Sequence, residues 1–301
     1  MKLHRTPRLV LGTAQFGLPY GPGGASRPLD PGIVSEILEA AWAGGIDTLD
    51  TALAYGTAEQ AIGELRPPQA QFKVISKTAP VRAESVSAAA ASHVLDGVKD
   101  SIRRLRVNAL DALLVHHAPD LLVPGGAALF RALETLRNDG LVGRLGVSVY
   151  DAPTLRAVLA DFPIEIVQLP INLLNQSLLS SGMIADLVRR GIEVHARSVF
   201  LQGALLMEPA ALSERFAALG AQLVRIRTEA AAAGLSPAAA ALGFVARCAP
   251  ISRIVIGVNT AAQLRDNILA LAAGAAVPWA RDTASYASDD PDLIDPRRWT
   301  A

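Results

Sequence analysis

Residues 111–148 read DALLVHHAPDLLVPGGAALFRALETLRNDGLVGRLGVS and contain one complete strand–helix–strand unit. The short apolar run Ala112–His116 has the length of a buried strand, and residues 126–138 carry apolar side chains at helical spacing. Gly140 stands where that helix would stop, and a second strand, Leu145–Ser148, follows it. Parallel strands joined by a helix are the building unit of α/β folds, so this stretch predicts the fold class.

The same unit recurs from one end of the chain to the other. The predicted strands are Leu9–Gly12, Ile46–Asp50, Phe72–Ser76, Ala112–His116, Leu145–Ser148, Ile166–Leu169, Glu193–Arg197 and Ile254–Gly257. The predicted helices lie near residues 32–43, 58–65, 84–105, 126–138, 152–160, 178–190, 213–233 with 237–247, and 261–273. Eight such alternations predict an α/β fold in which one closed parallel (β/α)8 barrel, a TIM barrel, forms a single domain over residues 1–301.

An open, doubly wound sheet is the alternative architecture. It would place a glycine-rich dinucleotide fingerprint after the first strand, and residues 11–17, LGTAQFG, do not fit that pattern. The barrel therefore stays the favoured prediction.

Composition narrows the partners and the compartment. Lys plus Arg equals Asp plus Glu at 28 each, without a long run of like charge, so we expect neither nucleic acid nor a membrane surface as a partner. The single cysteine, Cys248, cannot form an internal disulfide, which favours a cytoplasmic location. We expect a small-molecule partner, no metal site, and a monomer or small homo-oligomer.

Polar residues gather where the predicted strands end, which is where (β/α)8 barrels carry their chemistry. The residues at the strand ends are Gly12, Thr13, Asp50, Lys77, His116, His117, Ser148, Gln168, Arg197, Ser198 and Gly257, of which all but the two glycines have polar side chains. Buried Asp, Lys and His are costly unless they are paired, so their occurrence at consecutive strand ends predicts a shared site.

Tyr55, close behind Asp50, completes a set suited to carbonyl reduction. A tyrosine hydroxyl has a pKa of about 10 and is a poor acid at neutral pH. We expect the Lys77 ammonium to lower that pKa, and Asp50 to keep Lys77 charged and oriented. An imidazole from His116 would hold the carbonyl oxygen beside Tyr55. Since the sequence has no evident redox side chain or metal cluster, a cofactor must supply the hydride.

At this point the sequence resembles the aldo-keto reductase family, almost from end to end. The resemblance is carried by LGTAQFG at 11–17, GGIDTLDTALAYG at 44–56, DALLVHHAPD at 111–120, GLVGRLGVSVY at 140–150 and IGVNTAAQLRDN at 256–267. It implies a (β/α)8 barrel that binds NADP(H) at the carboxyl ends of the strands. It also implies that Asp50, Tyr55, Lys77 and His116 form the catalytic tetrad.

Two histidines compete for the last place in that tetrad. The family spacing from Asp111 selects His116, whereas a His-x-Pro cue selects His117. Neighbours on a strand point to opposite faces, so only one can face the substrate, and His116 is favoured.

The resemblance also carries cofactor contacts onto this chain. It places the nicotinamide amide against Ser148 and Gln168, the adenine against Asn267, and a pyrophosphate contact at Ser198. The other residues expected to bind the cofactor are Gly12, Thr13, Arg197, Gly257 and Gln263. Val149 stands where family members usually have asparagine. Asn172 either lines the same edge or caps a loop.

The adenosine end departs from the family pattern. Gly257, Val258 and Gln263 occupy positions where many members have lysine, serine and arginine for the 2′-phosphate. Asn259 and Arg265 are the remaining candidates for that contact. NADP(H) stays the favoured cofactor, and NAD(H) is the alternative.

The family spans aldehydes, ketones, sugars and steroids, and this sequence does not select among them. The expected substrate-selecting loops carry Gln15, Phe16, Tyr20, Tyr150, Trp279 and Trp299. Two other functions stay open: a Schiff-base aldolase acting through Lys77, and a non-catalytic, NADP(H)-binding regulatory subunit.

Overall fold

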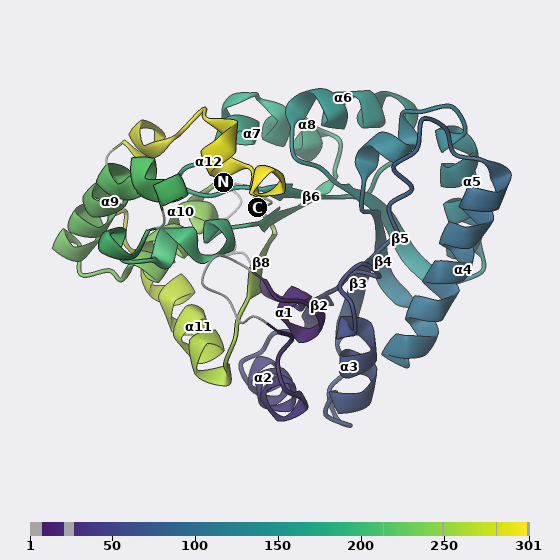
Figure 1. The fold of residues 1–301 in the computed structure, drawn as a ribbon, viewed down its shortest axis with the longest axis horizontal. Coiled ribbons are helices and arrows are strands. Elements are labelled where there is room, and N and C mark those ends of the chain that lie inside the picture. Colours follow the sequence, from purple (N-terminus) through teal and green to yellow (C-terminus); the bar gives the residue numbers. More distant parts are fainter. Residues whose placement is uncertain (1–7, 21–26, 213, 249, 281, 300–301) are drawn as a thin grey trace.

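A computed structural model describes residues 8–20, 27–212, 214–248, 250–280 and 282–299 of the chain. Eight strands lie at the centre and helices surround them (Figure 1). The strands are β1 (Arg8–Gly12), β2 (Thr48–Asp50), β3 (Lys73–Lys77), β4 (Leu110–Val115), β5 (Val142–Ser148), β6 (Ile166–Pro170), β7 (Glu193–Arg197) and β8 (Arg253–Gly257). Each pairs in parallel with the next, and β8 pairs with β1, so the predicted closed (β/α)8 barrel is confirmed.

The main helices connect these strands in the predicted order. They are α1 (Ala14–Gly17), α2 (Pro31–Ala43), α3 (Ala58–Leu65), α4 (Ala88–Leu105), α5 (Gly126–Asn138), α6 (Ala152–Asp161), α7 (Ser177–Ser180), α8 (Met183–Arg189), α9 (Gly220–Ala232), α10 (Pro237–Arg247), α11 (Ala261–Ala276) and α12 (Pro291–Ile294). Short 3-10 turns precede α9 and surround α12.

Several predicted boundaries move, each for a local reason. The helix expected over 178–190 is broken at Gly182, whose φ of +75° ends α7 and begins α8. The helix expected from 213 begins as α9 only at Gly220, because residues 214–219 form a 3-10 turn; residue 213 lies outside the described residues. The helix expected from 84 starts at Ala88, where the Ser87 side chain accepts the Ala90 N–H.

The inside of the barrel has three layers, which β3 illustrates. Alternate residues of a strand share a face, so Lys73, Ile75 and Lys77 lie one above another along the barrel. Ile75 belongs to a small fully buried apolar cluster with Ala112, Leu114 and Ile166. This apolar layer separates a polar layer at the carboxyl ends of the strands from a charged layer at the amino ends.

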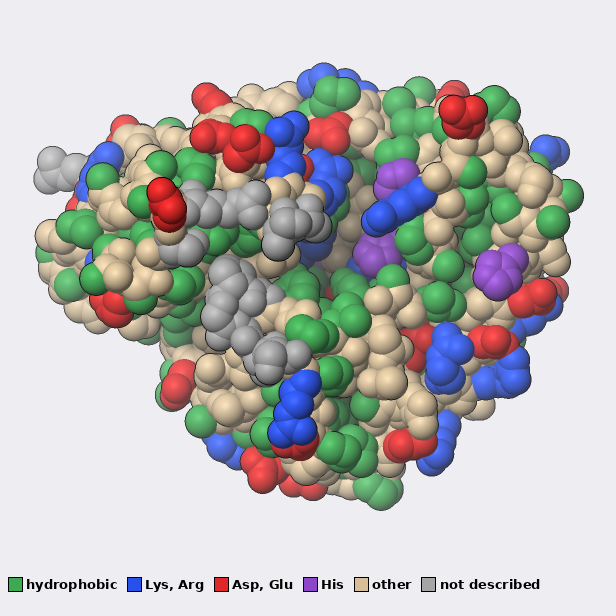
Figure 2. All heavy atoms as spheres, in the orientation of Figure 1, with side chains coloured by type: hydrophobic (Ala, Val, Ile, Leu, Met, Phe, Trp, Pro, Cys, Tyr) green, Lys and Arg blue, Asp and Glu red, His purple; other side chains and the backbone are tan. Residues whose placement is uncertain are grey.

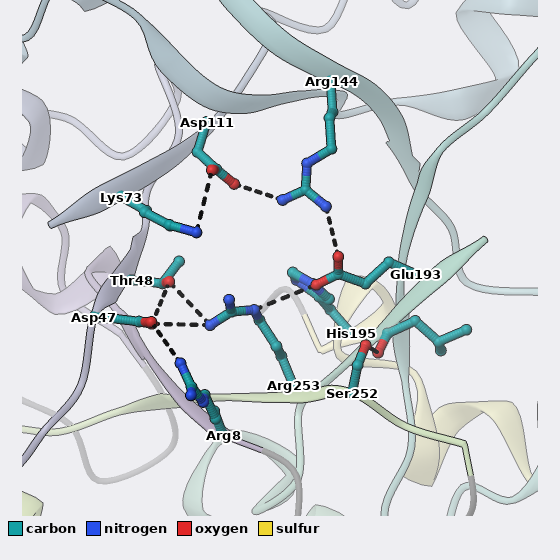
Figure 3. A network of polar contacts seen from close by, with 11 residues as sticks. Arg8, Asp47, Thr48, Lys73, Asp111, Arg144, Glu193, His195, Ser252 and Arg253 are labelled. Atoms are coloured by element: carbon teal, nitrogen blue, oxygen red, sulfur yellow. Dashed lines mark hydrogen bonds and ion pairs between the residues drawn. The ribbon is translucent and has the colours of Figure 1, made fainter. Parts of the chain in front are cut away.

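The charged layer closes the amino-terminal end of the barrel (Figure 3). Arg253 donates to Asp47 Oδ1 at 3.0 Å and to Glu193 Oε1 at 3.3 Å. Arg144 bridges Glu193 to Asp111, at 2.5 Å in each direction. The network joins residues from the beginnings of several strands, and it occupies the end that carries stability in such barrels.

Glu193 is the acid on which this network converges. Its Oε1 lies 2.7 Å from His195 Nε2, inside the barrel. The hydrogen bond with His195 and the Arg144 cation hold the pKa of Glu193 well below its usual range, against the opposing effect of burial. The carboxylate therefore stays charged at neutral pH.

Removing the central cation of this layer tests its contribution to stability. The Arg253 side chain is only 13% exposed and pairs with both Asp47 and Glu193. Arg253→Met removes this shared, largely buried partner from both acids. We expect the free energy of unfolding, measured by urea denaturation, to fall by about 2–4 kcal/mol. Arg27→Met is the control, because Arg27 pairs with Asp30 on the surface at 74% exposure, and should cost less than about 1 kcal/mol. Equal, small losses in both variants would contradict a structural role for the charged layer.

Candidate active site

A cavity of about 600 Å³ opens at the carboxyl ends of the strands. In the space-filling view, Lys or Arg side chains gather at one rim of a central hollow and histidine side chains lie beside it (Figure 2). All the site residues predicted from the sequence line this one cavity: Gly12, Thr13, Asp50, Tyr55, Lys77, His116, Ser148, Gln168, Arg197, Ser198, Gly257, Gln263 and Asn267.

The floor of the cavity is a buried hydrogen-bonded ion pair. Lys77 Nζ lies 2.6 Å from Asp50 Oδ2, and the two side chains are 1% and 4% exposed. Gln168 Nε2 donates to the other carboxylate oxygen at 2.7 Å, and Lys77 also donates to the Thr51 carbonyl at 2.9 Å. Burial lowers the pKa of Lys77, and the carboxylate of Asp50 opposes that effect. Both charges are thus fixed by three strands: β2, β3 and β6.

Tyr55 stands above this pair on the loop that follows β2. Lys77 Nζ lies 5.0 Å from the centroid of its ring. The loop is held against α1, since a Cβ on Gly17 would come within 1.9 Å of the Tyr55 carbonyl oxygen. Only glycine allows that approach, so Gly17 helps to set the position of Tyr55.

The charge environment of Tyr55 differs from the expectation. Burial raises the pKa of its hydroxyl, the Asp50 carboxylate raises it further, and Arg197 opposes both. The pKa of Tyr55 is thus raised overall, whereas the sequence predicted that Lys77 would lower it. The phenol is therefore protonated at neutral pH, the state that a proton donor requires.

The two adjacent histidines have different surroundings. The His116 ring meets the Tyr55 ring edge-on, with centroids 5.9 Å apart. Its buried Nδ1 has no hydrogen-bond partner among the described residues. Burial, Lys77 and Arg197 lower the pKa of His116 to about 3, so its ring is neutral. A neutral imidazole has one donor and one acceptor nitrogen, and this ring faces the cavity.

His117 is used elsewhere. Its Nδ1 lies 2.9 Å from Asp120 Oδ1, and Asp120 also accepts the backbone N–H groups of Val81 and Arg82. His117 therefore helps to fix the loop after β3, and it does not line the cavity.

The cavity wall formed by the residues after β7 contains non-glycine residues with positive φ angles. Ser198, Leu201 and Gln202 have φ values of +56°, +48° and +54°, a conformation that non-glycine residues rarely adopt. Asn172 donates to the Ser198 carbonyl at 3.0 Å and accepts two backbone N–H groups of its own loop. Asn172 is thus a loop cap that supports this wall.

Sequence reasoning missed part of that wall. Gln202, Gly203, Leu206 and Met207 line the cavity beyond Phe200. The only sequence signal for a turn there is the glycine at position 203, which has a φ of +102° in the structure. The contribution of Pro296 from the C-terminal segment was also missed.

The far end of the cavity is formed by the β8–α11 connection. Asn259, Gln263, Asp266 and Asn267 line it, and Gln263 Oε1 accepts the Asn259 N–H at 2.8 Å. Arg265 lies in a different hollow, beside Glu36 and Glu39 of α2. It is therefore not one of the residues that line this cavity.

Neither a metal-ligand cluster nor a single membrane-spanning helix occurs among the described residues. They contain no group of three or more His, Cys, Asp or Glu side chains that could hold a metal ion. None of the described helices is by itself long and apolar enough to cross a membrane; one bent pair, Phe216–Ala232 with Pro237–Arg247, meets the length and composition criteria together.

Comparison with known proteins decides the family. The profile of the aldo/keto reductase family matches residues 8–275, which is most of the chain. The chain belongs to the aldo/keto reductase family. Membership supports an oxidoreductase that uses a nicotinamide cofactor.

Individual relatives of this aldo/keto reductase are distant. It is 28% identical to a D-threo-aldose 1-dehydrogenase of a Pseudomonas species over 297 residues, covering 85% of this chain and 89% of that protein. It is 28% identical to the D-arabinose 1-dehydrogenase of Saccharomyces cerevisiae over 148 residues, covering 47% of this chain and 42% of that protein. The match therefore spans less than half the length of the yeast enzyme.

The fold has close counterparts among solved structures. An aldo-keto reductase from Bacillus halodurans superposes with a TM-score of 0.68 at 18% identity, covering 93% of this chain and 89% of that one. A glycerol dehydrogenase from Gluconobacter oxydans superposes with a TM-score of 0.67 at 21% identity, covering 88% of this chain and 86% of that one. At these identities the likeness concerns the fold.

The low pKa of His116 predicts a pH dependence of stability. The unfolded chain binds a proton at His116 below its usual pKa of 6.5, whereas the folded protein does so only near 3. The unfolded state then binds more protons in this window, so the free energy of unfolding falls as the pH drops from 6.5 towards 3.

We expect His116→Gln to weaken that dependence in urea denaturation measured across this range. His93→Gln, at an exposed position on α4, is the matched control and should keep the wild-type slope. Parallel curves for wild type and His116→Gln would contradict a neutral, buried His116.

Proposed function

We propose that this protein is an NAD(P)(H)-dependent oxidoreductase that reduces an aldehyde, ketone or sugar carbonyl, or oxidises the corresponding alcohol or sugar. The observation that carries the proposal is the environment of Tyr55. Its protonated phenol lies between the Lys77–Asp50 pair and the neutral His116, on the wall of a cavity large enough for a small ligand.

Each member of the tetrad has a physical task in this proposal. Tyr55 gives its proton to the carbonyl oxygen, and in the reverse direction takes it from the alcohol. The neutral His116 donates a hydrogen bond to the same oxygen and so orients the carbonyl. Lys77 stabilises the negative charge left on Tyr55, and Asp50 holds Lys77 in place. The nicotinamide cofactor supplies the hydride when it is bound.

The cavity wall fits such a cofactor. Gly12 and Gly257 line it at the ends of β1 and β8, and the Gln15 side chain packs directly against Gly257, where a Cβ would lie 2.4 Å from Gln15 Nε2. We propose that Ser148 and Gln168 bind the nicotinamide amide, that Thr13 and Ser198 lie along the cofactor, and that Gln263 and Asn267 bind the adenosine.

The choice between the two dinucleotides depends on the adenosine end. The family pattern favours NADP(H). Two features of this chain favour NAD(H): Arg265 lies outside the cavity, and the lining residue Asp266 is an acid, which would repel a 2′-phosphate. Titration with NADPH and with NADH therefore belongs in the first experiment.

No observation favours the alternative functions. A Schiff-base lysine must present a neutral, accessible amine, whereas Lys77 is 1% exposed and bound to both Asp50 and Thr51. A purely regulatory role leaves the assembled tetrad without a purpose.

Tyr55→Phe tests the mechanism. The variant loses the proton donor and keeps the ring, so kcat on an aldehyde or sugar panel should fall about 10²–10⁴-fold while cofactor binding, followed by fluorescence titration, is retained. Tyr286→Phe is the matched control: its hydroxyl binds Glu229 on the outer helix α9, and activity should be kept.

Three outcomes would contradict the proposal in different ways. Full activity of Tyr55→Phe would show that Tyr55 is not the proton donor. Failure of the wild type to bind either dinucleotide would contradict the proposed oxidoreductase function. Trapping of a substrate on Lys77 by borohydride would favour the aldolase.

A further inference from the structure

Tyr150, just beyond β5, lies between two arginine side chains at the mouth of the cavity. Its ring centroid is 4.0 Å from Arg197 Cζ and 3.8 Å from Arg297 Cζ. Two guanidinium groups at these distances would collide over one face, so they lie on opposite faces of the ring. Arg297 comes from the C-terminal segment, whose Pro296 also lines the cavity.

The two guanidinium groups differ in how their charge is balanced. Arg297 binds both carboxylate oxygens of Asp295, at 2.9 Å and 2.6 Å. Arg197 forms no ion pair with a carboxylate of the described residues, and instead donates to the Val149 carbonyl at 3.0 Å and to Ser198 Oγ at 3.3 Å. A guanidinium group has five N–H donors, so three of those on Arg197 have no partner among the described residues.

The uncompensated cation lies at the reacting end of the cavity. Arg197 lowers the pKa of His116 and opposes the rise in the pKa of Tyr55, so its charge acts on both groups. The other charges there form two ion pairs, Lys77 with Asp50 and Arg297 with Asp295, and the Asp295 carboxylate also interacts with Arg197. Asp266 of α11 lines the opposite end and forms no ion pair with another described residue. The reacting end of the cavity is therefore electropositive.

We propose that Arg197 binds an oxyanion group of the substrate, a carboxylate or a phosphate, close to the carbon that reacts at Tyr55. The substrate class is then an anionic carbonyl compound or alcohol, such as a sugar acid or a sugar phosphate. This inference rests on the proposed function. A planar guanidinium forms two parallel hydrogen bonds to such groups, which gives the contact both strength and direction.

Tyr150 and Arg297 act as positioning residues for this contact. Stacking on Tyr150 and the hydrogen bond to Val149 fix the plane of the Arg197 guanidinium. Asp295 pairs with Arg297 and leaves Arg197 as the cation available to a ligand. These contacts place the Arg197 guanidinium beside the end of β5.

The test compares three matched substrates: a neutral aldose, the uronic acid of that aldose, and its phosphate ester. We expect the wild type to have a higher kcat/KM for at least one of the anionic compounds than for the neutral one. Arg197→Gln should lower that ratio by about 10–100-fold, mainly through KM, because a hydrogen bond to a charged group is lost. Arg197→Lys keeps the positive charge but loses the planar guanidinium that forms two parallel hydrogen bonds, so its ratio should lie between those of the wild type and Arg197→Gln. A larger loss of kcat/KM for the uronic acid indicates a carboxylate ligand, and a larger loss for the phosphate ester indicates a phosphate.

Cofactor titrations on the same variants separate this inference from other outcomes. If Arg197→Gln weakens NADH or NADPH binding and leaves the substrate ratio unchanged, Arg197 serves the cofactor and the inference is wrong. Equal wild-type kcat/KM for all three compounds would also overturn it, while the proposed function stands. If the wild type binds no dinucleotide, the proposed function fails and the inference falls with it. Arg297→Gln is the matched control, and its ratio should change less than that of Arg197→Gln.

Discussion

The ion pair between Lys77 and Asp50 is the interaction on which the rest of the site depends. Two charges that are almost fully buried are costly to desolvate, and they persist here because each is also hydrogen-bonded, Asp50 to Gln168 and Lys77 to the Thr51 carbonyl. These contacts tie three strands together at the mouth of the barrel. Beside this pair, burial and the Asp50 carboxylate keep Tyr55 protonated, while burial and the Lys77 cation keep His116 neutral.

The barrel separates stability from chemistry along its axis. The apolar layer around Ile75 divides the charged network of Arg253 and Glu193 from the polar mouth. Along β3 the same face carries Lys73 in the charged layer and Lys77 in the site, so one strand serves both ends. Substitutions at the mouth can therefore change ligands without disturbing the layer that closes the other end.

The sequence predicts most of this arrangement, because strand alternation and strand ends are local signals. The eight strands and the gathering of Asp50, Lys77 and His116 follow from those signals. The direction of the Tyr55 pKa does not, since it depends on how deeply the fold buries the hydroxyl and on how close it brings Asp50. The stacking of Arg297 on Tyr150 could not be predicted either, because no local pattern brings these two side chains together.

The central claim is that a carbonyl carbon receives a hydride in this cavity. The most direct test uses NADH and NADPH labelled with deuterium at the transferable position of the nicotinamide, together with an aldehyde or sugar panel including anionic members. We expect product that carries deuterium on the former carbonyl carbon, and we expect Tyr55→Phe to slow its formation greatly. Each cofactor is supplied in both of its stereospecifically deuterated forms. Turnover that gives product without deuterium from all of these forms would contradict hydride transfer in this cavity.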